Sequence, residues 1–324
     1  MFNSTILHVV NMEFRQIDLE EYFYSLVRQI PRGMVTSYGD LSEAMGDKIS
    51  ARACGYMLSV NPHPDFTPCY RVVHSTGDVG NYTHPLGPEE KIRRLSKDGI
   101  VIENKKIRDF ERIRFREFLS DYPLKRLQED QKKLAESISS GDGDLGDGIA
   151  GVDVSYFGNI AIGCTVFFRN GQMTKKYSVT KVNFPYIPGY LSYREFPAVS
   201  LLLHGFDGTV FLDGNGQLHP RKMGLATFVG VEMGLRTIGI AKSLTRGRVE
   251  GSWVYFDNER RGYIMNSKTI ISAGNLISLD EAVSFTEREF GRKYPWILKV
   301  AHDECTQLAK KIRSSIPDDQ HGEN

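Results

Sequence analysis

The sequence predicts an α/β protein of two domains, with a helix-turn-helix in the first and a mixed sheet with flanking helices in the second. Its 324 residues exceed what one typical domain needs. Two short helical patterns, at residues 38–45 and 49–60, flank the turn "GDK". From residue 149 onwards, three consecutive strand patterns are followed by alternating helical and strand patterns. These observations place a helical domain before a domain built on a sheet.

The bulk properties are those of an ordinary soluble protein, with 40% hydrophobic and 25% charged residues. The formal net charge is only +1, so any contact with nucleic acid must come from local patches. The four cysteines are far apart and form no CxxC pair, which argues against a structural zinc site and a disulfide framework and fits a reducing cytoplasm. No signal peptide or membrane-spanning run is recognisable. We therefore expect a cytoplasmic protein that binds no membrane.

The second of the two helical patterns has an apolar stripe opposite a face of small residues, with Arg52 between them. The stripe consists of Ile49, Ala53, Met57 and Val60. A helix with a small-residue face can lie close to DNA, but many helical hairpins share this layout. Between residues 91 and 116, ten Lys and Arg stand against four Asp and Glu. That excess fits either a DNA-facing patch or an ordinary solvated surface.

The stretch "DFTPCYRVV" at residues 65–73 places Cys69 between Pro68 and Tyr70. A free cysteine is usually a small buried hydrophobe without a chemical role. The alternative is a nucleophile, which acts through its thiolate form and needs a partner that takes or stabilises its proton. The motifs on either side of Cys69 favour the nucleophile.

These motifs resemble the O6-alkylguanine-DNA alkyltransferases over about residues 20–105. The blocks "IPRGMVTSYGDLSEAMG", "ARACGYMLSVNP", "PCYRVV", "GDVGNY" and "LSKDG" occur in that family's order and spacing. The resemblance implies that Cys69 accepts an alkyl group irreversibly from a flipped-out guanine, without a cofactor. It also implies that Arg52 fills the gap in the DNA stack and that Tyr38 presses on the phosphate. The remaining implied residues are Asn61, which would orient the active-site loop, and the pocket-lining Val72, Tyr82 and Thr83.

The active-site motif departs from the family pattern, which is Pro-Cys-His-Arg followed later by a glutamate. Tyr70 stands in place of the histidine and Asp98 in place of the glutamate. A phenol, with a pKa of about 10, is a poor base at neutral pH, but its hydroxyl can donate a hydrogen bond to a thiolate. We therefore expect an active but altered relay, in which the thiol ionises at a higher pH than is usual for the family. His84 stands where the family has glycine, so we expect bulky adducts to fit poorly.

Strand patterns open the second domain, in the blocks "IAGVDVSYF", "IAIGCTVFF" and "KKYSVTKV". Gly158-Asn159 and Asn170-Gly171 mark the turns between them. Two further buried strands, "GTVFLDG" and "RTIGIAKS", are separated by the helical "MGLATFVGVEMG". A meander followed by alternating helix and strand is typical of a ribonuclease H-like domain.

Polar residues interrupt these apolar patterns at a few positions. Asp153 lies in the middle of the first strand, where a buried carboxylate is costly unless it binds a cation or a partner. Asp213 ends a later strand, either as a ligand or as an ordinary turn former. Arg194 and Glu195 end the run "FPYIPGYLSYRE", whose two prolines exclude a regular helix. His302 lies on a late helical pattern, where a surface or core histidine is the alternative to a ligand.

The blocks "AGVDVSY", "PYIPGYLSYRE", "DGNGQLHPRKMGLA" and "IGIAKS" resemble endonuclease V across about residues 120–312. The resemblance implies that DNA is cleaved one nucleotide to the 3′ side of a deaminated base, chiefly hypoxanthine. It implies a Mg²⁺ site, with Mn²⁺ as the alternative, because such ions bind hard carboxylate oxygens and activate water. The implied metal ligands are Asp153, Glu195, Asp213 and His302.

The same resemblance assigns residues that would bind DNA. Tyr186 would be the wedge that replaces the everted base, and His219 and Lys242 would steady phosphates near the cut. The base pocket would be lined by Gly189, Leu191, Gly214 and Leu225.

Two departures from this family are visible. Asn275 stands where histidine is usual, and Asn215 where histidine or glutamine is common. Neither removes an implied metal carboxylate, so we expect weaker tuning rather than lost activity.

The whole chain thus resembles a fusion of two DNA-repair activities, of a kind seen in some archaea. We expect an alkyltransferase-like domain at residues 1–112 and an endonuclease V domain at residues 113–324. The expected partner is damaged DNA, bound by a monomer, with inosine-containing RNA as an open second substrate. Two alternatives stay open: a first domain that binds lesions without transferring, or a second domain that is a different ribonuclease H-like nuclease acting on RNA or junctions.

Overall fold

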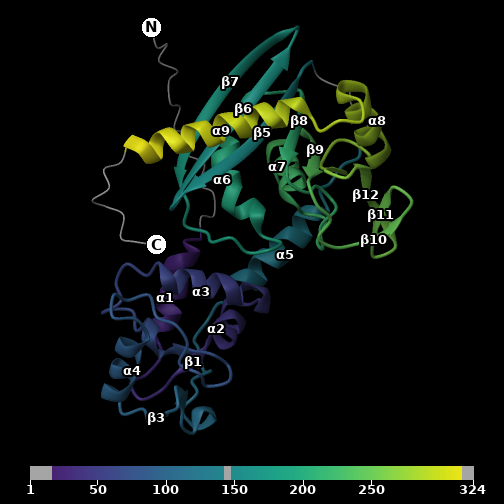
Figure 1. Ribbon diagram of the computed structural model, residues 1–324. Coiled ribbons are helices and arrows are strands. Elements are labelled where there is room, and N and C mark those ends of the chain that lie inside the picture. Colours follow the sequence, from purple (N-terminus) through teal and green to yellow (C-terminus); the bar gives the residue numbers. More distant parts are fainter. Residues whose placement is uncertain (1–16, 142–146, 316–324) are drawn as a thin grey trace. The chain divides into compact units, whose positions relative to one another are not determined.

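The computed structural model describes residues 17–141 and 147–315, which form two compact units (Figure 1). The first unit contains residues 17–130 with the segment 183–188, and the second contains residues 131–182 and 189–315. The predicted mixed α/β class, with a helical first part and a large mixed sheet in the second, is confirmed. The predicted domain boundary after residue 112 follows family resemblance rather than compactness, and it stays a prediction.

The first unit is mainly helical. Its helices are α1 (Leu19–Arg28), α2 (Tyr38–Met45), α3 (Ala51–Ser59) and α4 (Gly87–Lys97). Its strands are β1 (Thr36–Ser37), parallel to β2 (Val72–Val73), and β3 (Ile102–Glu103), antiparallel to β4 (Lys106–Ile107). Short 3-10 turns are η1 (Lys48–Ser50), η2 (Cys69–Arg71) and η3 (Phe110–Arg112). Helices α2 and α3 pack on each other, as predicted, although α3 begins later because η1 precedes it.

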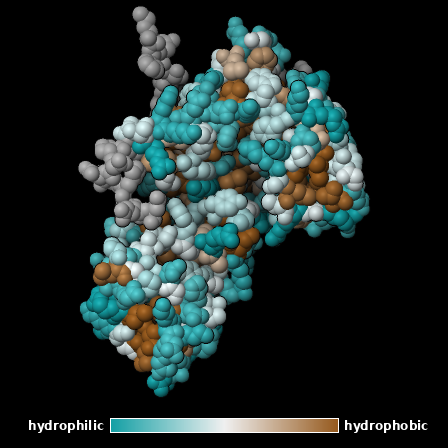
Figure 2. Space-filling view, in the orientation of Figure 1, coloured by the Kyte–Doolittle hydropathy of each residue, from teal (hydrophilic) through white to brown (hydrophobic). Residues whose placement is uncertain are grey.

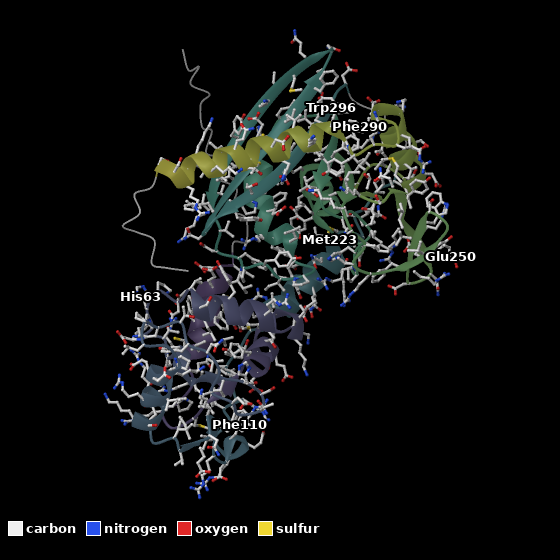
Figure 3. The ribbon with its side chains drawn as sticks, in the orientation of Figure 1. His63, Phe110, Met223, Glu250, Phe290 and Trp296 are labelled. Carbon is white, nitrogen blue, oxygen red and sulfur yellow. The ribbon has the colours of Figure 1, made fainter. Side chains whose placement is uncertain are left out.

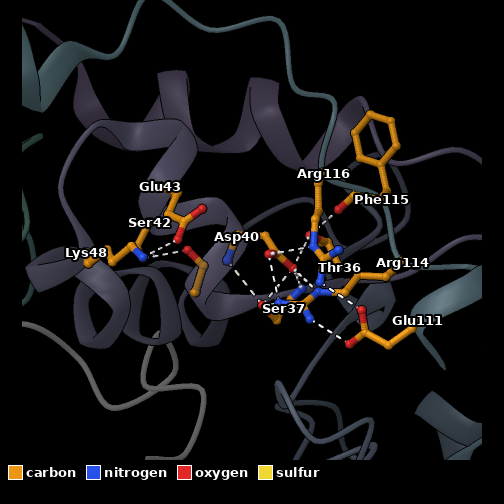
Figure 4. Close-up of polar contacts among 11 residues, drawn as sticks. Thr36, Ser37, Asp40, Ser42, Glu43, Lys48, Glu111, Arg114, Phe115 and Arg116 are labelled. Atoms are coloured by element: carbon orange, nitrogen blue, oxygen red, sulfur yellow. Dashed lines mark hydrogen bonds and ion pairs between the residues drawn. The ribbon is translucent and has the colours of Figure 1, made fainter.

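A buried capping box fixes the start of α2 (Figure 4). The Asp40 backbone N–H donates to Ser37 Oγ at 3.1 Å, and the Asp40 carboxylate accepts the Ser37 N–H at 3.0 Å. The same carboxylate pairs with Arg114, whose Nε and Nη2 lie 2.8 and 2.9 Å from its two oxygens. Burial favours a raised pKa for Asp40, but the hydrogen bonds from Arg114 and Ser37 outweigh burial and lower it. Arg114 therefore fastens the chain after η3 to the start of the helix-turn-helix.

Helix α5 (Pro123–Ala135) belongs to both units, because residues up to Asp130 group with the first and Gln131 onwards with the second. Its buried Leu124 and Leu127 precede this division, and Leu134 packs on the core of the second unit.

A nine-stranded sheet forms the centre of the second unit, in the order β10-β11-β12-β13-β9-β8-β5-β6-β7. Three strands, β5 (Ile149–Phe157), β8 (Thr209–Asp213) and β9 (Arg236–Ala241), run parallel, and the other pairs are antiparallel. The antiparallel strands are β6 (Ile160–Arg169), β7 (Gln172–Lys181), β10 (Arg248–Glu250), β11 (Trp253–Phe256), β12 (Glu259–Asn266) and β13 (Thr269–Ala273). The three opening strands and their turns are therefore confirmed.

Helices cover both faces of the sheet. One face packs against α6 (Leu191–Leu203) and α7 (Leu225–Met233), and the other against α8 (Leu279–Phe290) and α9 (Trp296–Ser315). Figure 3 labels two aromatic residues of this second layer, Phe290 at the end of α8 and Trp296 at the start of α9, whose rings meet edge to face. The expectation that no regular helix contains Arg194 and Glu195 is wrong. The prolines stand before α6, where they end the preceding loop without breaking the helix that follows.

Helix α9 lies against β5 at backbone distance. A Cβ atom added to Gly151 would be 2.8 Å from the carbonyl carbon and oxygen of Ile297, which is closer than real Cβ atoms approach backbone. Glycine at this position therefore lets the helix carrying His302 pack directly beside the strand carrying Asp153.

The surface combines hydrophilic areas with separate small apolar patches (Figure 2). Exposed apolar side chains in the described residues include Phe66, Leu86 and Tyr186. None of the helices within 17–141 and 147–315 has the length and hydropathy to cross a membrane.

Candidate active sites

The first candidate site is the turn that begins at Cys69. Cys69 is the first residue of η2, directly after Pro68, and only 6% of it is exposed. Its thiol donates a weak hydrogen bond to the Tyr82 hydroxyl, with 3.8 Å between sulfur and oxygen. Asn61 Nδ2 donates to the Thr67 carbonyl at 3.3 Å and so ties down the loop that enters the turn. The structure therefore places at the Cys69 turn three residues that the alkyltransferase resemblance implies: Cys69, Tyr82 and Asn61.

Tyr70 does not face the thiol in the expected way. Its hydroxyl donates to Asp98 Oδ2 at 3.0 Å, and Arg71 Nε donates to the same oxygen at 2.8 Å. A phenol has one proton, so Tyr70 cannot donate to a Cys69 thiolate while it donates to Asp98. Burial raises the pKa of Tyr70 and the Asp98 charge adds to this, while Arg71 opposes it. The structure therefore differs from the expected hydrogen bond between phenol and thiolate.

The implied DNA-binding residues of the first unit differ in how far they are exposed to solvent. Val72 is buried in β2, directly after η2, whereas Thr83 is exposed. Tyr38 is half-buried at the start of α2, and Arg52 is exposed on α3. The His84 ring stacks on Tyr82 with 5.8 Å between centroids. The roles of these residues stay predictions.

The second candidate site draws one residue from each of four elements: Asp153 from β5, Glu195 from α6, Asp213 from the end of β8 and His302 from α9. His302 Nδ1 lies 2.9 Å from Asp153 Oδ2. The Tyr156 hydroxyl donates to Glu195 Oε1 at 2.9 Å, and Lys242 pairs with Asp213.

Burial and neighbouring negative charge raise the pKa values of two of these carboxylates, Glu195 and Asp153. Burial raises the pKa of Glu195 to about 8; the bond from Tyr156 opposes the rise, and the charges of Asp153 and Asp213 add to it. Burial, then the charge of Asp213, raises the pKa of Asp153 despite its contact with His302. Such crowding of negative charge is relieved by a bound cation.

The donor chemistry fits a hard divalent cation, because three carboxylates lie within electrostatic reach of one another. Among the described residues, however, no three His, Cys, Asp or Glu side chains are arranged so that they could hold a metal ion. In this structure their oxygens are instead occupied by Tyr156, Lys242 and His302. The assignment of the four ligands stays a prediction.

Three of the residues implied for the base pocket, Gly189, Gly214 and Leu225, have close neighbours in the structure, and their roles stay predictions. The Gly189 carbonyl accepts from Arg221 Nη2 at 2.8 Å and faces His219 Nε2 at 3.2 Å. A Cβ atom on Gly214 would lie 3.2 Å from Leu225 Cβ, so these residues are neighbours. His219 is buried, and its Nδ1 accepts backbone N–H groups, so its contacts in this structure are with backbone. Its implied contact with a phosphate stays a prediction, as do the roles of Lys242 and Leu191.

Tyr186, the implied wedge, is 62% exposed in the segment 183–188.

Sequence reasoning missed two residues that the structure places at or near these sites, Tyr156 and Lys91, and it did not foresee what Asn275 contacts. Tyr156 holds Glu195, and the Arg194 guanidinium covers its ring at 4.1 Å. Lys91 is buried on α4, which packs against the Cys69 turn. Its burial could have been inferred from the sequence, because Lys91 stands four residues before the buried Leu95 on the same helix face. Asn275 binds backbone on both sides, donating to the Gly230 carbonyl at 2.9 Å and accepting from the Ser139 N–H at 3.0 Å. Asn275 therefore has a structural role that the family comparison did not reveal.

Comparison with known proteins assigns each unit a relative. The family model described as Endonuclease V matches residues 132–303. The model described as 6-O-methylguanine DNA methyltransferase, DNA binding domain, matches residues 18–100. A solved endonuclease V from Ciona intestinalis, in complex with a 24mer DNA containing an inosine followed by a ribo-adenosine, superposes with a TM-score of 0.53. It is 25% identical and covers 60% of this chain and 100% of its own.

Two relatives match nearly the full chain, and both are named bifunctional methyltransferase/endonuclease. The protein of Picrophilus torridus is 50% identical over 296 residues, covering 91% of this chain and 98% of its own. The protein of Thermoplasma volcanium is 43% identical over 308 residues and covers 95% of each chain.

Proposed function

We propose, on the premise that this chain belongs to the family of bifunctional methyltransferase/endonucleases, that it corrects two kinds of altered base in DNA. The chain is an enzyme with a methyltransferase part and an endonuclease part. The finer proposal concerns the substrates: O6-alkylguanine for the first unit and hypoxanthine for the second.

In the first reaction, the Cys69 sulfur attacks the alkyl carbon on guanine O6. The S–C bond forms as the C–O6 bond breaks, and the guanine keeps the electron pair and takes up one proton. The thiol gives up one proton, so the sum is alkylated cysteine and ordinary guanine. The reaction cannot repeat on the same chain, because the thioether is not reversed. Asn61 holds the loop that leads into the Cys69 turn. Because Cys69 is nearly buried, only a base that has been extruded from the duplex can reach its thiol.

In the second reaction, a phosphodiester bond near the deaminated base is hydrolysed. A divalent cation on Asp153, Glu195 and Asp213, with His302 beside them, would polarise the phosphate and lower the pKa of a bound water. Tyr156 orients the Glu195 carboxylate, and His302 orients that of Asp153. The Gly189 loop, fixed by Arg221, supplies backbone groups to read the base edge.

One observation carries the nuclease proposal. Burial raises the pKa of Glu195 to about 8, and the charges of Asp153 and Asp213, from two other elements, add to the rise. A protein tolerates such a cost where the acids serve a function. The structurally similar Ciona intestinalis protein was solved with inosine-containing DNA, which supports hypoxanthine as the base.

Two assays test the proposal. A duplex carrying O6-methylguanine is incubated with the whole protein, followed by intact mass and a map of the Cys69 peptide, with Cys69→Ser as control. A duplex carrying inosine is assayed for nicking with Mg²⁺, with Mn²⁺ and with a chelator, using Asp153→Ala as control. One methyl group on Cys69 and metal-dependent nicking are expected. Intact nicking without methylation would reduce the first unit to a lesion-binding module, and nicking by Asp153→Ala would overturn the metal assignment.

A further inference from the structure

We propose that Gln131 is a positioning residue for the base pocket of the second unit, because it holds Arg221 and the loop at Gly189 in one arrangement. This inference rests on the proposed incision at hypoxanthine. It deepens that proposal by naming a residue, outside the motifs that carry the resemblance, on which the choice of base depends.

Gln131 is a polar side chain that the fold buries completely. It lies in the second half of α5, and none of it is exposed to solvent. Its Oε1 accepts from Arg221 Nε at 2.5 Å, and its Nε2 donates to the carbonyls of Gly189 at 3.2 Å and Met223 at 3.4 Å. An arginine Nε only donates and a carbonyl only accepts, so these partners fix which end of the amide is oxygen. One buried side chain therefore joins α5 to two loops that follow much later in the chain.

Arg221 transmits this contact to the loop at Gly189. Its Nη2 donates to the Gly189 carbonyl at 2.8 Å, and its guanidinium carbon lies 4.9 Å from the centroid of the Tyr190 ring. The guanidinium group is planar and rigid, so the bond from Nε to Gln131 also sets the direction in which Nη2 points. Gln131 thus acts on Gly189 both directly and through Arg221.

The peptide group after Gly189 is held from one side. The φ angle of Gly189 is +83°, a conformation that glycine adopts readily and other residues rarely do. Its carbonyl is bound by Arg221 and Gln131 and faces His219. Because a trans peptide is planar, the N–H of Tyr190 points away from these three side chains. The bonds from Gln131 and Arg221 therefore determine which way the backbone groups of this loop point.

Fixed backbone groups matter for the choice of base. Hypoxanthine and guanine share a keto oxygen and differ only in the amino group of guanine. A pocket distinguishes such similar ligands only if its polar groups are held to within roughly 0.5 Å. Removal of the Gln131 amide leaves Arg221 Nε and two carbonyls without this partner, which favours other arrangements of the loop. We expect the loss to fall on discrimination between bases rather than on DNA binding as a whole.

The test compares the wild-type full chain with Gln131→Met and Gln131→Leu, which replace the amide by apolar groups. Gln128→Met is the matched control, because Gln128 is a glutamine of the same helix whose Nε2 donates to Asp47 at 2.8 Å. Each protein is titrated against two fluorescent duplexes that differ at one position, deoxyinosine in one and deoxyguanosine in the other. A chelator prevents incision, and anisotropy gives the two dissociation constants.

The preference for the inosine duplex, expressed as the ratio of the two constants, should fall about tenfold in both Gln131 variants. Gln128→Met should keep the wild-type ratio. The ratio separates positioning from mere stability, because a partly unfolded protein loses affinity for both duplexes by the same factor. Arg221→Met, alone and combined with Gln131→Met, completes a double-mutant cycle. The double variant should lose little more preference than Arg221→Met alone.

A second measurement needs no DNA. Hydrogen–deuterium exchange in peptides that span residues 187–193 should be faster in Gln131→Met than in the wild type, because the loop loses a fixed partner. Gln128→Met should show the wild-type exchange. Should Gln131→Met fail to fold, Gln131→Leu takes its place in both measurements.

The outcomes separate this inference from the proposed substrate. If the wild type prefers the inosine duplex and both Gln131 variants keep its ratio, the inference is overturned. If the wild type binds both duplexes equally, hypoxanthine is overturned as the recognised base, and the exchange rates decide about Gln131. Faster exchange would then leave its positioning role standing, and unchanged exchange would overturn that role as well.

Discussion

Single side chains in the second unit are held in one protonation state by their surroundings, and His219 is the best example. Burial, followed by the charges of Arg221 and Arg261, lowers the pKa of His219 from 6.5 to about 4. The neutral ring accepts backbone N–H groups at Nδ1 and faces the Gly189 carbonyl with Nε2. Protonation would remove the acceptor at Nδ1.

The sign of the pH effect follows from this lowered pKa. Between about pH 6.5 and 4 the unfolded chain binds more protons at His219 than the folded chain, so the free energy of unfolding falls as the pH falls. The contribution is complete above pH 6.5, and its loss reaches about 3 kcal/mol near pH 4. We expect His219→Gln to flatten this dependence in denaturant titrations from pH 7 to 4. The exposed His204→Gln should keep the wild-type slope; if it also flattens, the effect does not come from His219.

The sequence identified the candidate site residues wherever they lie within a recognisable motif. It did not predict which way their side chains point or what they contact. The nucleophile and the acidic residues stood out because few other reasons place them in those motifs. The Tyr70 hydroxyl was expected to face the thiolate, but it turns to Asp98, a preference set by Arg71 and packing. Lys91 was overlooked because its burial depends on the whole turn around it rather than on α4 alone.

At the scale of elements, local signals predicted the helices and strands well, and errors arose where a turn changed the direction of the chain. Helix α2 was predicted with its observed bounds, because a capping box and Gly46 define its ends. The prolines before α6 were wrongly extended to the residues after them. The Asp40–Arg114 pair, which joins α2 to a segment far along the chain, could not be read from local sequence at all.

The pair between Asp40 and Arg114 should stabilise the first unit. Asp40→Asn leaves the Arg114 guanidinium, 15% exposed, without its buried counter-charge, so we expect a loss of about 3 kcal/mol in the free energy of unfolding. The folded-state pKa of Asp40 is lowered, so this contribution is present above about pH 4 and is lost as the pH falls through the folded value. Chemical denaturation at pH 7 measures the loss. Glu43→Gln, which breaks the exposed pair with Lys48, should leave the free energy of unfolding nearly unchanged and serves as control.

At the scale of the whole molecule, each unit has its own hydrophobic core and its own candidate site. The cluster that includes Val35, Val73 and Leu95 lies in the first unit, and two larger clusters line the faces of the sheet in the second. In the proposed function, the first reaction would be spent after one turnover, whereas hydrolysis in the second unit could repeat. The number of chains would then limit alkyl repair but not incision.

Full methylation of Cys69 should leave the incision rate on inosine DNA within about twofold of the unmodified protein. The reason is that Cys69 lies in the first unit, whereas the four implied metal ligands of the nuclease lie in the second. Pre-treatment with excess O6-methylguanine duplex, a mass check of Cys69 and a multiple-turnover nicking assay measure this. A large change in rate would mean that the two activities communicate, and Cys69→Ser with the same pre-treatment controls for bound DNA.

The close approach of α9 to Gly151 limits which residues evolution can place at position 151. A methyl group there meets the backbone of Ile297 rather than a side chain that could rotate away, so the helix itself must move. His302 rides on that helix and would leave Asp153. A lineage in which Gly151 became alanine would lose the nuclease while every acidic residue remained in its gene. A check for the presence of the acidic site residues alone would then classify an inactive nuclease as active.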